Sequence, residues 1–281
     1  MKICEWLQKV QLSGLDRLDA DLILMYALGA NDRSYLTLHS EDILSPATIK
    51  VADKMVKRRF KKEPLAFILG YREFYGRRFA VMDAGVKTLI PRPESEMIID
   101  IAKEIAPDTI LDVGTGSGVL ALTLAAEMPQ SSVVATDICP EYYSVFCKNA
   151  TNLGLAVASF SEQTYAPSLA PTPVWFTVSN LLDNISTHFG LIVANLPYVD
   201  GKWEWLDKDA LSYEPYSALF AEDDGLGLIK KLIVQVKQKS ASDCLIIEAD
   251  PCQFGAIIAF AIGCGFTLLE ERGFQLLFRV N

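Results

Sequence analysis

The sequence has few residues of the kinds that build metal sites or disulfide frameworks. Histidine occurs only at His39 and His188 in 281 residues. None of the six cysteines lies at the close paired spacing of a metal-binding motif. They stand at positions 4, 139, 147, 244, 252 and 264. We therefore predict no metal site and interpret the cysteines as small, buried apolar residues.

The sequence shows no membrane-spanning run, and no secretion leader is apparent in it. The longest uncharged apolar stretch, Phe254 to Leu269, has 16 residues and contains three glycines. It is shorter than the roughly 20 residues that cross a bilayer, and it predicts a buried helix that leads into a strand. The first ten residues include Lys2, Glu5 and Lys9 and have no apolar leader core. We expect a cytoplasmic protein with no membrane partner.

The larger part of the chain lacks an excess of positive charge. The net charge is −9, and residues 84–281 hold 12 Lys and Arg against 24 Asp and Glu. Such a surface argues against stable, sequence-blind binding of nucleic acid, which requires many cations to neutralise phosphates. Residues 1–83 hold 14 basic against 11 acidic residues, with a basic run from Lys54 to Lys62. That run is either a solvated helix face or a docking surface, and a local contact with nucleic acid stays open.

The composition is that of a globular protein with a sizeable core. Hydrophobic residues make up 51% of the chain and charged residues 22%. The length predicts one large domain and a smaller one.

The first 69 residues have the periodicity of a small helical domain. One set of apolar residues recurs three or four positions apart and is followed by Gly29, a typical helix stop. A second helix should start at Ser45-Pro46. The predicted buried faces are Leu15, Leu18, Leu22, Met25 and Tyr26 for the first helix, and Ile49, Ala52, Val56 and Phe60 for the second.

The rest of the chain predicts a hairpin followed by an α/β domain. Residues 70–88 contain short β-branched and aromatic stretches separated by Gly76 and Gly85, as in a β-hairpin linker. Residues 89–281 then alternate strands and helices, which predicts a mostly parallel, doubly wound sheet. Strands are expected at 110–113, 133–136, 191–194, 244–247 and 275–280, with helices at 119–128 and 141–152. Residues 156–174, rich in Ala, Ser, Pro and Thr, are predicted to form a surface loop.

A glycine-rich turn joins the first strand of that domain to a helix. Its residues are Gly114, Thr115, Gly116, Ser117 and Gly118. Glycines at such a turn allow a ligand to approach backbone N–H groups at the helix N-terminus. The dinucleotide fingerprint requires glycine at position 119, where this chain has Val119, so a nicotinamide cofactor is disfavoured.

Two aspartates flank this turn in the sequence. Asp137 follows the second strand, where a carboxylate can accept hydrogen bonds from ribose hydroxyls. Asp112 precedes the turn, and its carboxylate is suited to orient the cationic amino end of a methionine-like group. Each aspartate alone is equally consistent with a turn or cap, but together with the glycine turn they favour a nucleoside ligand.

The tetrapeptide Asn195-Leu196-Pro197-Tyr198 directly follows a predicted strand. This is the crevice position at which open α/β sheets bind ligands. Asn195 offers a side-chain oxygen and Leu196 a backbone carbonyl, while Pro197 stiffens the turn and Tyr198 provides a flat ring. Two acceptors beside an aromatic ring suit a planar NH2 group.

The sequence resembles the release-factor glutamine methyltransferases of the HemK/PrmC type over nearly its whole length. The segments that carry the likeness are 63–70, 73–76, 89–94 with its Ile-Pro-Arg-Pro-Glu run, 111–118, 195–198, 214–219 and 224–226. The resemblance implies a Rossmann-like, seven-stranded class I methyltransferase domain at 89–281. It also implies a helical substrate-recognition domain at 1–69 and a β-hairpin linker at 70–88.

The same resemblance implies the chemistry and the residues of the site. The cofactor would be S-adenosylmethionine, held by Gly114 to Gly118 and Asp137. The substrate would be the glutamine of the Gly-Gly-Gln motif of a peptide chain release factor. Asn195 and the Leu196 carbonyl would bind its amide NH2, and Arg92 and Glu94 would either shape the entrance or form a structural ion pair.

Two positions depart from the family pattern. The family usually has proline where this chain has Leu196, and Asn-Leu-Pro-Tyr resembles the ribosomal RNA dimethyladenosine transferases instead. The family also has an acidic residue near the adenine pocket where this chain has Asn180. Two alternatives therefore stay open: an adenine amino-group methyltransferase of RNA or DNA, and a catalytically impaired protein that still binds the cofactor.

Overall fold

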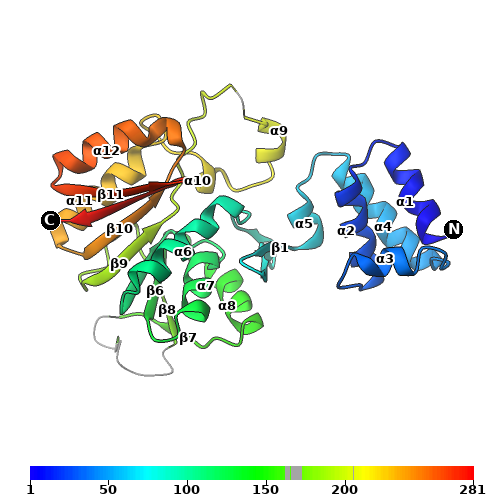
Figure 1. Cartoon of the computed structure of the whole chain (residues 1–281), viewed down its shortest axis with the longest axis horizontal. Helices are drawn as coiled ribbons and strands as arrows, with labels where there is room; N and C mark the ends of the chain where they lie inside the picture. The colour runs from blue at the N-terminus through cyan, green and yellow to red at the C-terminus, as the bar shows by residue number, and fades with distance from the viewer. Residues whose placement is uncertain (162–164, 166–172, 205) are drawn as a thin grey trace. The chain divides into compact units, whose positions relative to one another are not determined.

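The computed structural model describes residues 1–161, 165, 173–204 and 206–281. The chain forms two compact units. One comprises Met1–Tyr71 with Asp207–Tyr213, and the other comprises Arg72–Leu206 with Glu214–Asn281. Figure 1 labels most of the elements of both.

The first unit is helical, as its periodicity predicts. Its helices are α1 (Ile3–Leu12), α2 (Arg17–Leu28), α3 (Ser34–Leu38), α4 (Pro46–Arg59), α5 (Leu65–Leu69) and α9 (Lys208–Leu211). The predicted helix ends are confirmed. Gly29 follows α2 in the left-handed conformation with φ of 70°, and the Ser45 hydroxyl accepts a hydrogen bond from the Thr48 N–H at 3.0 Å to cap α4.

The predicted buried face of α2 is partly wrong. Leu18 and Tyr26 are each 48% exposed, whereas Ala20, Ile23 and Leu24 are fully buried. Apolar residues surround much of α2, so helical spacing alone does not select the face that packs against α1 and α4. Phe60, predicted on the buried face of α4, lies one residue past its end and is 49% exposed.

Residues 71–87 form two short hairpins instead of the single predicted one. The first pairs β1 (Tyr71–Phe74) with β2 (Arg77–Ala80), and the second pairs β3 (Met82–Asp83) with β4 (Val86–Lys87). Gly76 and Gly85 stand in the two turns with φ of 70° and 88°. Each glycine therefore makes its own reversal of the chain.

The second unit contains a mostly parallel sheet of eight strands. Their order is β11-β12-β10-β9-β5-β6-β8-β7, and β12 alone pairs antiparallel with its two neighbours. The bounds are β5 (Thr109–Val113), β6 (Ser132–Asp137), β7 (Val157–Ser159), β8 (Val174–Val178), β9 (Phe189–Ala194), β10 (Ser242–Glu248), β11 (Phe266–Arg272) and β12 (Gln275–Val280). The doubly wound α/β fold is thus confirmed.

The edge strand β7 gives the sheet eight strands where the resemblance implies seven, and it corrects the predicted surface loop at 156–174. Val157–Ser159 pairs with β8 at the edge of the sheet, and β8 itself begins at Val174. A three-residue strand of small side chains is too short to show a periodicity of two. The rest of that prediction, at 162–164 and 166–172, lies outside the described residues.

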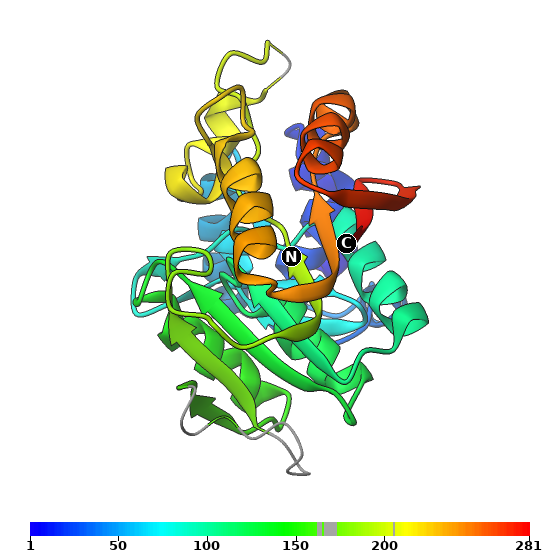
Figure 2. The same ribbon diagram turned by 90° about the vertical axis from the view of Figure 1, so that its left-hand side faces the viewer.

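Helices cover both faces of the sheet (Figure 2). One core joins the sheet to α6 (Glu96–Ile105), α7 (Val119–Glu127) and α8 (Tyr142–Asn152). The other joins it to α11 (Gly227–Lys239) and α12 (Phe254–Gly263). The run from Phe254 is thus a helix that leads into β11, as predicted, but it is buried on one face only, at Phe254, Ile257 and Ala261. None of the helices in the described ranges combines the length and the apolar character that crossing a membrane requires.

Asn149 ties three parts of this unit together. From α8, its Oδ1 accepts the Ala80 N–H at 2.7 Å, and its Nδ2 donates to the Ala80 carbonyl at 3.0 Å. The same Nδ2 donates to the Ser117 carbonyl of the glycine turn at 2.9 Å. All these groups are buried, so one side chain links the hairpin, α8 and the turn.

We expect Asn149→Ala to lower the free energy of unfolding by roughly 3 kcal/mol, because it leaves buried backbone groups without partners. Urea denaturation measures this loss. Asn152→Ala, an exposed position on the same helix, is the matched control and should change stability by less than about 0.5 kcal/mol. Equal effects of the two substitutions would contradict the bridging role of Asn149.

Candidate active site

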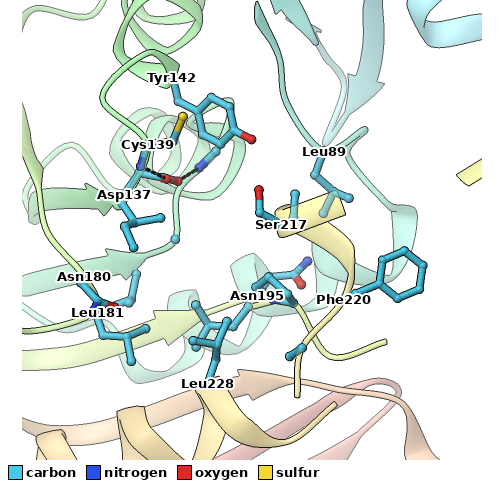
Figure 3. A pocket seen from close by; sticks show the side chains of 18 of the residues that line it. Leu89, Asp137, Cys139, Tyr142, Asn180, Leu181, Asn195, Ser217, Phe220 and Leu228 are labelled. Carbon is cyan, nitrogen blue, oxygen red and sulfur yellow. Dashed lines mark hydrogen bonds between the residues drawn. The ribbon is translucent and has the colours of Figure 1, made fainter. Parts of the chain in front are cut away.

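A cavity of about 650 Å3 opens at the carboxyl ends of the parallel strands. Figure 3 shows residues that follow β6, β8 and β9 around it, together with the segment after Glu214, and Val113 and Gly114 at the end of β5 complete this part of the lining. Its predicted lining residues are Gly114, Gly116, Asp137, Asn180, Asn195, Leu196 and Pro197. Within the described ranges, no three His, Cys, Asp or Glu side chains gather to hold a metal ion.

The three glycines of the turn have different functions. All have positive φ, of 78° at Gly114, 55° at Gly116 and 83° at Gly118. A Cβ at Gly114 would lie 2.9 Å from Leu196 Cδ2, and one at Gly118 would lie 2.5 Å from Phe146 Cδ2. A Cβ at Gly116 would meet nothing within 4 Å. Gly114 and Gly118 therefore permit close packing, while Gly116 leaves the cavity wall open to a ligand.

Asp137 lies at the end of β6 and faces the cavity. Its Oδ2 accepts the Gly116 N–H at 2.8 Å, and its Oδ1 accepts the Cys139 N–H at 2.9 Å (Figure 3). Burial raises the pKa of this carboxyl, and hydrogen bonds from the backbone N–H groups of Cys139, Gly116 and Ile138 oppose that rise. The carboxylate is thus held by the turn, with further lone pairs available to a ligand.

Asp112 supports the turn from behind and does not line the cavity. Its Oδ2 accepts the Thr115 hydroxyl at 2.6 Å and the Ala121 N–H at 3.1 Å. Among the described residues, its buried Oδ1 has no hydrogen-bond partner. Desolvation raises the pKa of Asp112 to about 7. Thr115, Ser117 and Gly118 also lie outside the lining, since their side chains or backbone face the protein.

Asn195 is presented directly by the end of β9. Its Nδ2 donates to the Ser95 hydroxyl oxygen at 2.9 Å, which fixes the orientation of the amide. Among the described residues, Oδ1 accepts no hydrogen bond, and Asn195 lines the same cavity as Ser217 (Figure 3). Asn195 therefore offers a positioned acceptor to a bound group.

The three residues after Asn195 have separate environments. Leu196 and Pro197 line the cavity, and the Leu196 side chain packs over Gly114. Tyr198 is not in the lining. Its hydroxyl donates to Glu248 Oε1 at 3.5 Å, and its carbonyl accepts from Gln253 Nε2 at 2.8 Å. The tyrosine thus anchors the loop to the protein.

Arg92 forms its ion pair with Glu214 and not with Glu94. The distance from Arg92 Nη2 to Glu214 Oε1 is 2.6 Å, and the buried Glu214 also accepts the Ile90 N–H at 2.9 Å. The backbone carbonyl of Glu94 accepts from Gln275 Nε2 at 2.8 Å. These contacts hold the 89–94 segment at the wall of the cavity, where Leu89 enters the lining.

Sequence reasoning missed more than half of the lining. The missed residues are Leu89, Val113, Ile138, Cys139, Tyr142, Ser179, Leu181, Tyr216, Ser217, Ala218, Phe220, Ala221, Glu222, Gly227 and Leu228. Ile138 is 66% exposed directly after Asp137, and an apolar residue at that strand end was a usable signal. For the segment from Tyr216 to Leu228 the one signal was the family likeness within 214–219 and 224–226, which did not place it at the cavity because only the fold returns it to this edge.

Two family models match the chain. Residues 5–70 match the PrmC N-terminal domain, and residues 83–208 match the methyltransferase small domain. Together with the parallel sheet and the glycine turn at its edge, they define the class of protein. It is a class I methyltransferase with a Rossmann-like catalytic domain.

Similar proteins of known identity narrow this class. The release factor glutamine methyltransferase of Koribacter versatilis is 38% identical over 227 residues, 78% of this chain and 74% of that one. That of Neisseria gonorrhoeae is 34% identical over 278 residues, 98% of this chain and 91% of that one. The chain belongs to the release factor glutamine methyltransferase family. The crystal structure of a ribosomal protein L11 methylase from Lactobacillus delbrueckii subsp. bulgaricus aligns at 21% identity with a TM-score of 0.47, covering 75% of this chain and 91% of that one.

The raised pKa of Asp112 predicts a dependence of stability on pH. Its pKa rises from about 3.9 in the unfolded chain to about 7 in the folded one. The stabilising contribution of this carboxyl group to the free energy of unfolding is therefore complete below about pH 3.9 and is lost as the pH rises through about 7. Asp112→Asn removes this titration. In urea denaturation, the stability of the variant relative to the parent should therefore increase by a few kcal/mol between about pH 5 and pH 8. A constant difference over that range would contradict the assignment.

Proposed function

We propose that the chain transfers a methyl group from S-adenosylmethionine to the side-chain amide nitrogen of the glutamine in the Gly-Gly-Gln motif of peptide chain release factors. The observation that carries this proposal is that Asn195 lines the cavity with its Nδ2 bonded to Ser95, while its Oδ1 accepts no hydrogen bond among the described residues. The matching family and its relatives supply the substrate class.

The cavity has the donors and acceptors that the cofactor requires. Asp137 faces it at the position suited to ribose hydroxyls, Gly116 leaves its wall open, and the exposed Ile138 offers an apolar surface for a nucleobase. Asn180 is a neutral hydrogen-bonding residue in the same lining. When bound, S-adenosylmethionine supplies an electrophilic methyl group on a positively charged sulfur. Asp112 fixes the glycine turn from behind through its bonds with the Thr115 hydroxyl and the Ala121 N–H.

Asn195 and Leu196 hold the amide that is to be methylated. The Asn195 Oδ1 and the Leu196 carbonyl each accept one N–H of the substrate NH2 group. An amide nitrogen is a poor nucleophile because its lone pair is delocalised, so its position relative to the methyl group dominates the rate. Positioning can supply up to about 7–11 kcal/mol of barrier reduction. The two acceptors also stabilise the positive charge that develops on nitrogen.

The chain needs no general base for this reaction. Asp137 and Asp112 are both bonded to the glycine turn, and Glu248 is buried away from the cavity lining. A methylated cationic amide is a strong acid that water can deprotonate. The side chains of the site therefore bind and orient, and none has to remove a proton from the substrate.

We further propose that residues 1–69 recognise the substrate and that 70–88 serve as linker to the domain at 89–281. Several residues of the basic run are internally paired, since Arg58 bonds Glu63, Arg59 bonds Asp19 and Lys62 bonds Asp209. Exposed lysines at 54, 57 and 61 remain for a partner. A brief contact with nucleic acid and a cytoplasmic location stay predictions.

The direct experiment measures labelled methyl transfer from S-adenosylmethionine to a purified release factor. A copy of the factor with its motif glutamine changed to alanine and a structured RNA are the controls. Label on the intact factor alone supports the proposal. Label on the RNA would favour an adenine amino-group methyltransferase, and cofactor binding without transfer would favour a catalytically impaired protein.

Asp137→Ala should weaken cofactor binding first, because the carboxylate both faces the cavity and holds Gly116. We expect a loss of affinity of at least tenfold, or about 1.4 kcal/mol, in a calorimetric titration with S-adenosylmethionine. The control is Asp108→Ala. It removes an exposed carboxylate directly before β5, at the end of that strand away from the cavity. Unchanged affinity for the Asp137 variant would remove this residue from the cofactor site.

Asn195→Ala should abolish most methyl transfer while the affinity for S-adenosylmethionine stays within a few fold. The substitution removes one of two acceptors for the substrate amide, and we expect kcat/KM to fall by about 100-fold or more. Steady-state kinetics with release factor and a separate cofactor titration measure the two effects. Transfer at the parental rate would rule out the proposed amide-binding role.

A further inference from the structure

A buried carboxyl group lies behind Asn195 without lining the cavity. Glu248 is the last residue of β10, and its side chain is fully buried. The preceding Ile247 pairs with Ala194, which precedes Asn195 in the neighbouring strand. The parallel register therefore places Glu248 beside the strand end that presents Asn195.

Hydrogen bonds connect this carboxyl group to Asn195 through one hydroxyl. A side-chain hydrogen bond with Ser95 is the largest of the effects that lower the pKa of the Glu248 carboxyl, and the Ser95 Oγ accepts from Asn195 Nδ2 at 2.9 Å. Glu248 also accepts from Tyr198 OH at 3.5 Å and from Gln275 Nε2 at 3.3 Å. Ser95 is thus the only polar link between Glu248 and Asn195 among the bonds that the described residues make.

A serine hydroxyl has one proton, so it can donate to only one of its two neighbours. The other neighbour must then donate to the serine oxygen. When Glu248 is ionised it can only accept, and the Ser95 proton points toward it. The Ser95 oxygen then accepts from Asn195 Nδ2, and Asn195 Oδ1 is turned to the cavity. When Glu248 is protonated it can donate to Ser95, whose own proton then suits the opposite orientation of the Asn195 amide.

We propose that Glu248 is a positioning residue that, through the Ser95 hydroxyl, fixes the Asn195 amide with its oxygen toward the substrate. The inference rests on the proposed function only in assigning the substrate NH2 group to that oxygen. With Glu248 ionised the site presents an acceptor to the substrate. With Glu248 protonated the amide loses this preference, and a share of molecules presents a donor where the substrate also has donors.

The surroundings of Glu248 bring the pKa of its carboxyl group close to neutral pH. Burial is the main cause that raises its pKa to about 7, and the nearby Glu94 raises it further. Ser95, Gln275 and the Tyr198 hydroxyl stabilise the ionised form. Its surroundings also include Arg92, which is paired with Glu214, and Asp250, which acts on Tyr198. No Lys or Arg among the described residues forms an ion pair with Glu248.

The kinetic test compares the pH dependence of kcat in the full-length protein, its Ser95→Ala and Glu248→Gln variants, and the double variant. Saturating S-adenosylmethionine and release factor keep the titration of Asp112 and Asp137 from entering through cofactor binding. We expect the parental kcat to fall as the pH decreases through about 7. Each single variant should lose this acid limb and lower kcat roughly tenfold at high pH.

The double variant separates a relay from two independent structural effects. If Ser95 and Glu248 act in series, the double variant should have the kcat of Ser95→Ala alone. Glu271→Gln, an exposed carboxylate of β11 with no described partner, is the matched control and should keep the parental profile. The proposal would be overturned if the fold losses in kcat of the two single variants multiplied in the double variant. It would also be overturned if Ser95→Ala kept the fall of kcat at low pH. The Ser95→Ala profile alone decides the question if Glu248→Gln does not fold.

A spectroscopic measurement tests the inference without turnover. The side-chain NH2 resonances of Asn195, assigned by their loss in Asn195→Asp, should shift with pH in the parent with a midpoint near 7 and should not shift in Glu248→Gln. The proposal would be overturned if these resonances did not shift with pH in the parent, or if they shifted equally in the parent and in Glu248→Gln. Absence of methyl transfer with a normal shift would instead contradict the proposed function and leave the positioning role supported.

Discussion

The parallel pairing of β5 between β6 and β9 is the constraint on which the site depends. It brings the ends of three strands to one edge, where β5 continues into the glycine turn, β6 ends at Asp137 and β9 continues into Asn195. A ligand at this edge therefore contacts residues that are 81 positions apart in the sequence, from Gly114 to Asn195. Asn149 secures the turn from α8, so the geometry of the edge is maintained by the packed core behind it.

The glycine turn after β5 and the segment after β9 pack against each other through Gly114 and Leu196. The leucine lies where the family usually has proline, and its side chain occupies the space that the missing Cβ of Gly114 leaves. Buried carboxyl groups then stabilise the two segments separately, Asp112 behind the turn and Glu248 behind Asn195. Neither lines the cavity: Asp112 accepts the Thr115 hydroxyl and the Ala121 N–H, and Glu248 is proposed to act through the Ser95 hydroxyl. The site is thus oriented by polar groups that a ligand does not meet.

The sequence predicted the parts of this arrangement that depend on neighbours along the chain. The helix ends at Gly29 and Ser45, the alternation of strands and helices, and the strand ends that present Asp137 and Asn195 all follow from local patterns. The buried face of α2, the edge strand β7 and the cavity wall from Tyr216 onward depend on tertiary packing. The inward anchoring of Tyr198 depends on Glu248 and was likewise hidden from the sequence.

The central claim is that Asn195 and Leu196 recognise the substrate as a donor of two hydrogen bonds. The most direct measurement is the binding of a release factor with its motif glutamine changed to glutamate, compared with the unchanged factor, in the presence of S-adenosylhomocysteine. Glutamate has nearly the same shape but carries no N–H, so two acceptors would face a carboxylate. The account predicts a loss of affinity of at least tenfold. Equal affinities would show that the site does not read the amide, and would contradict the account.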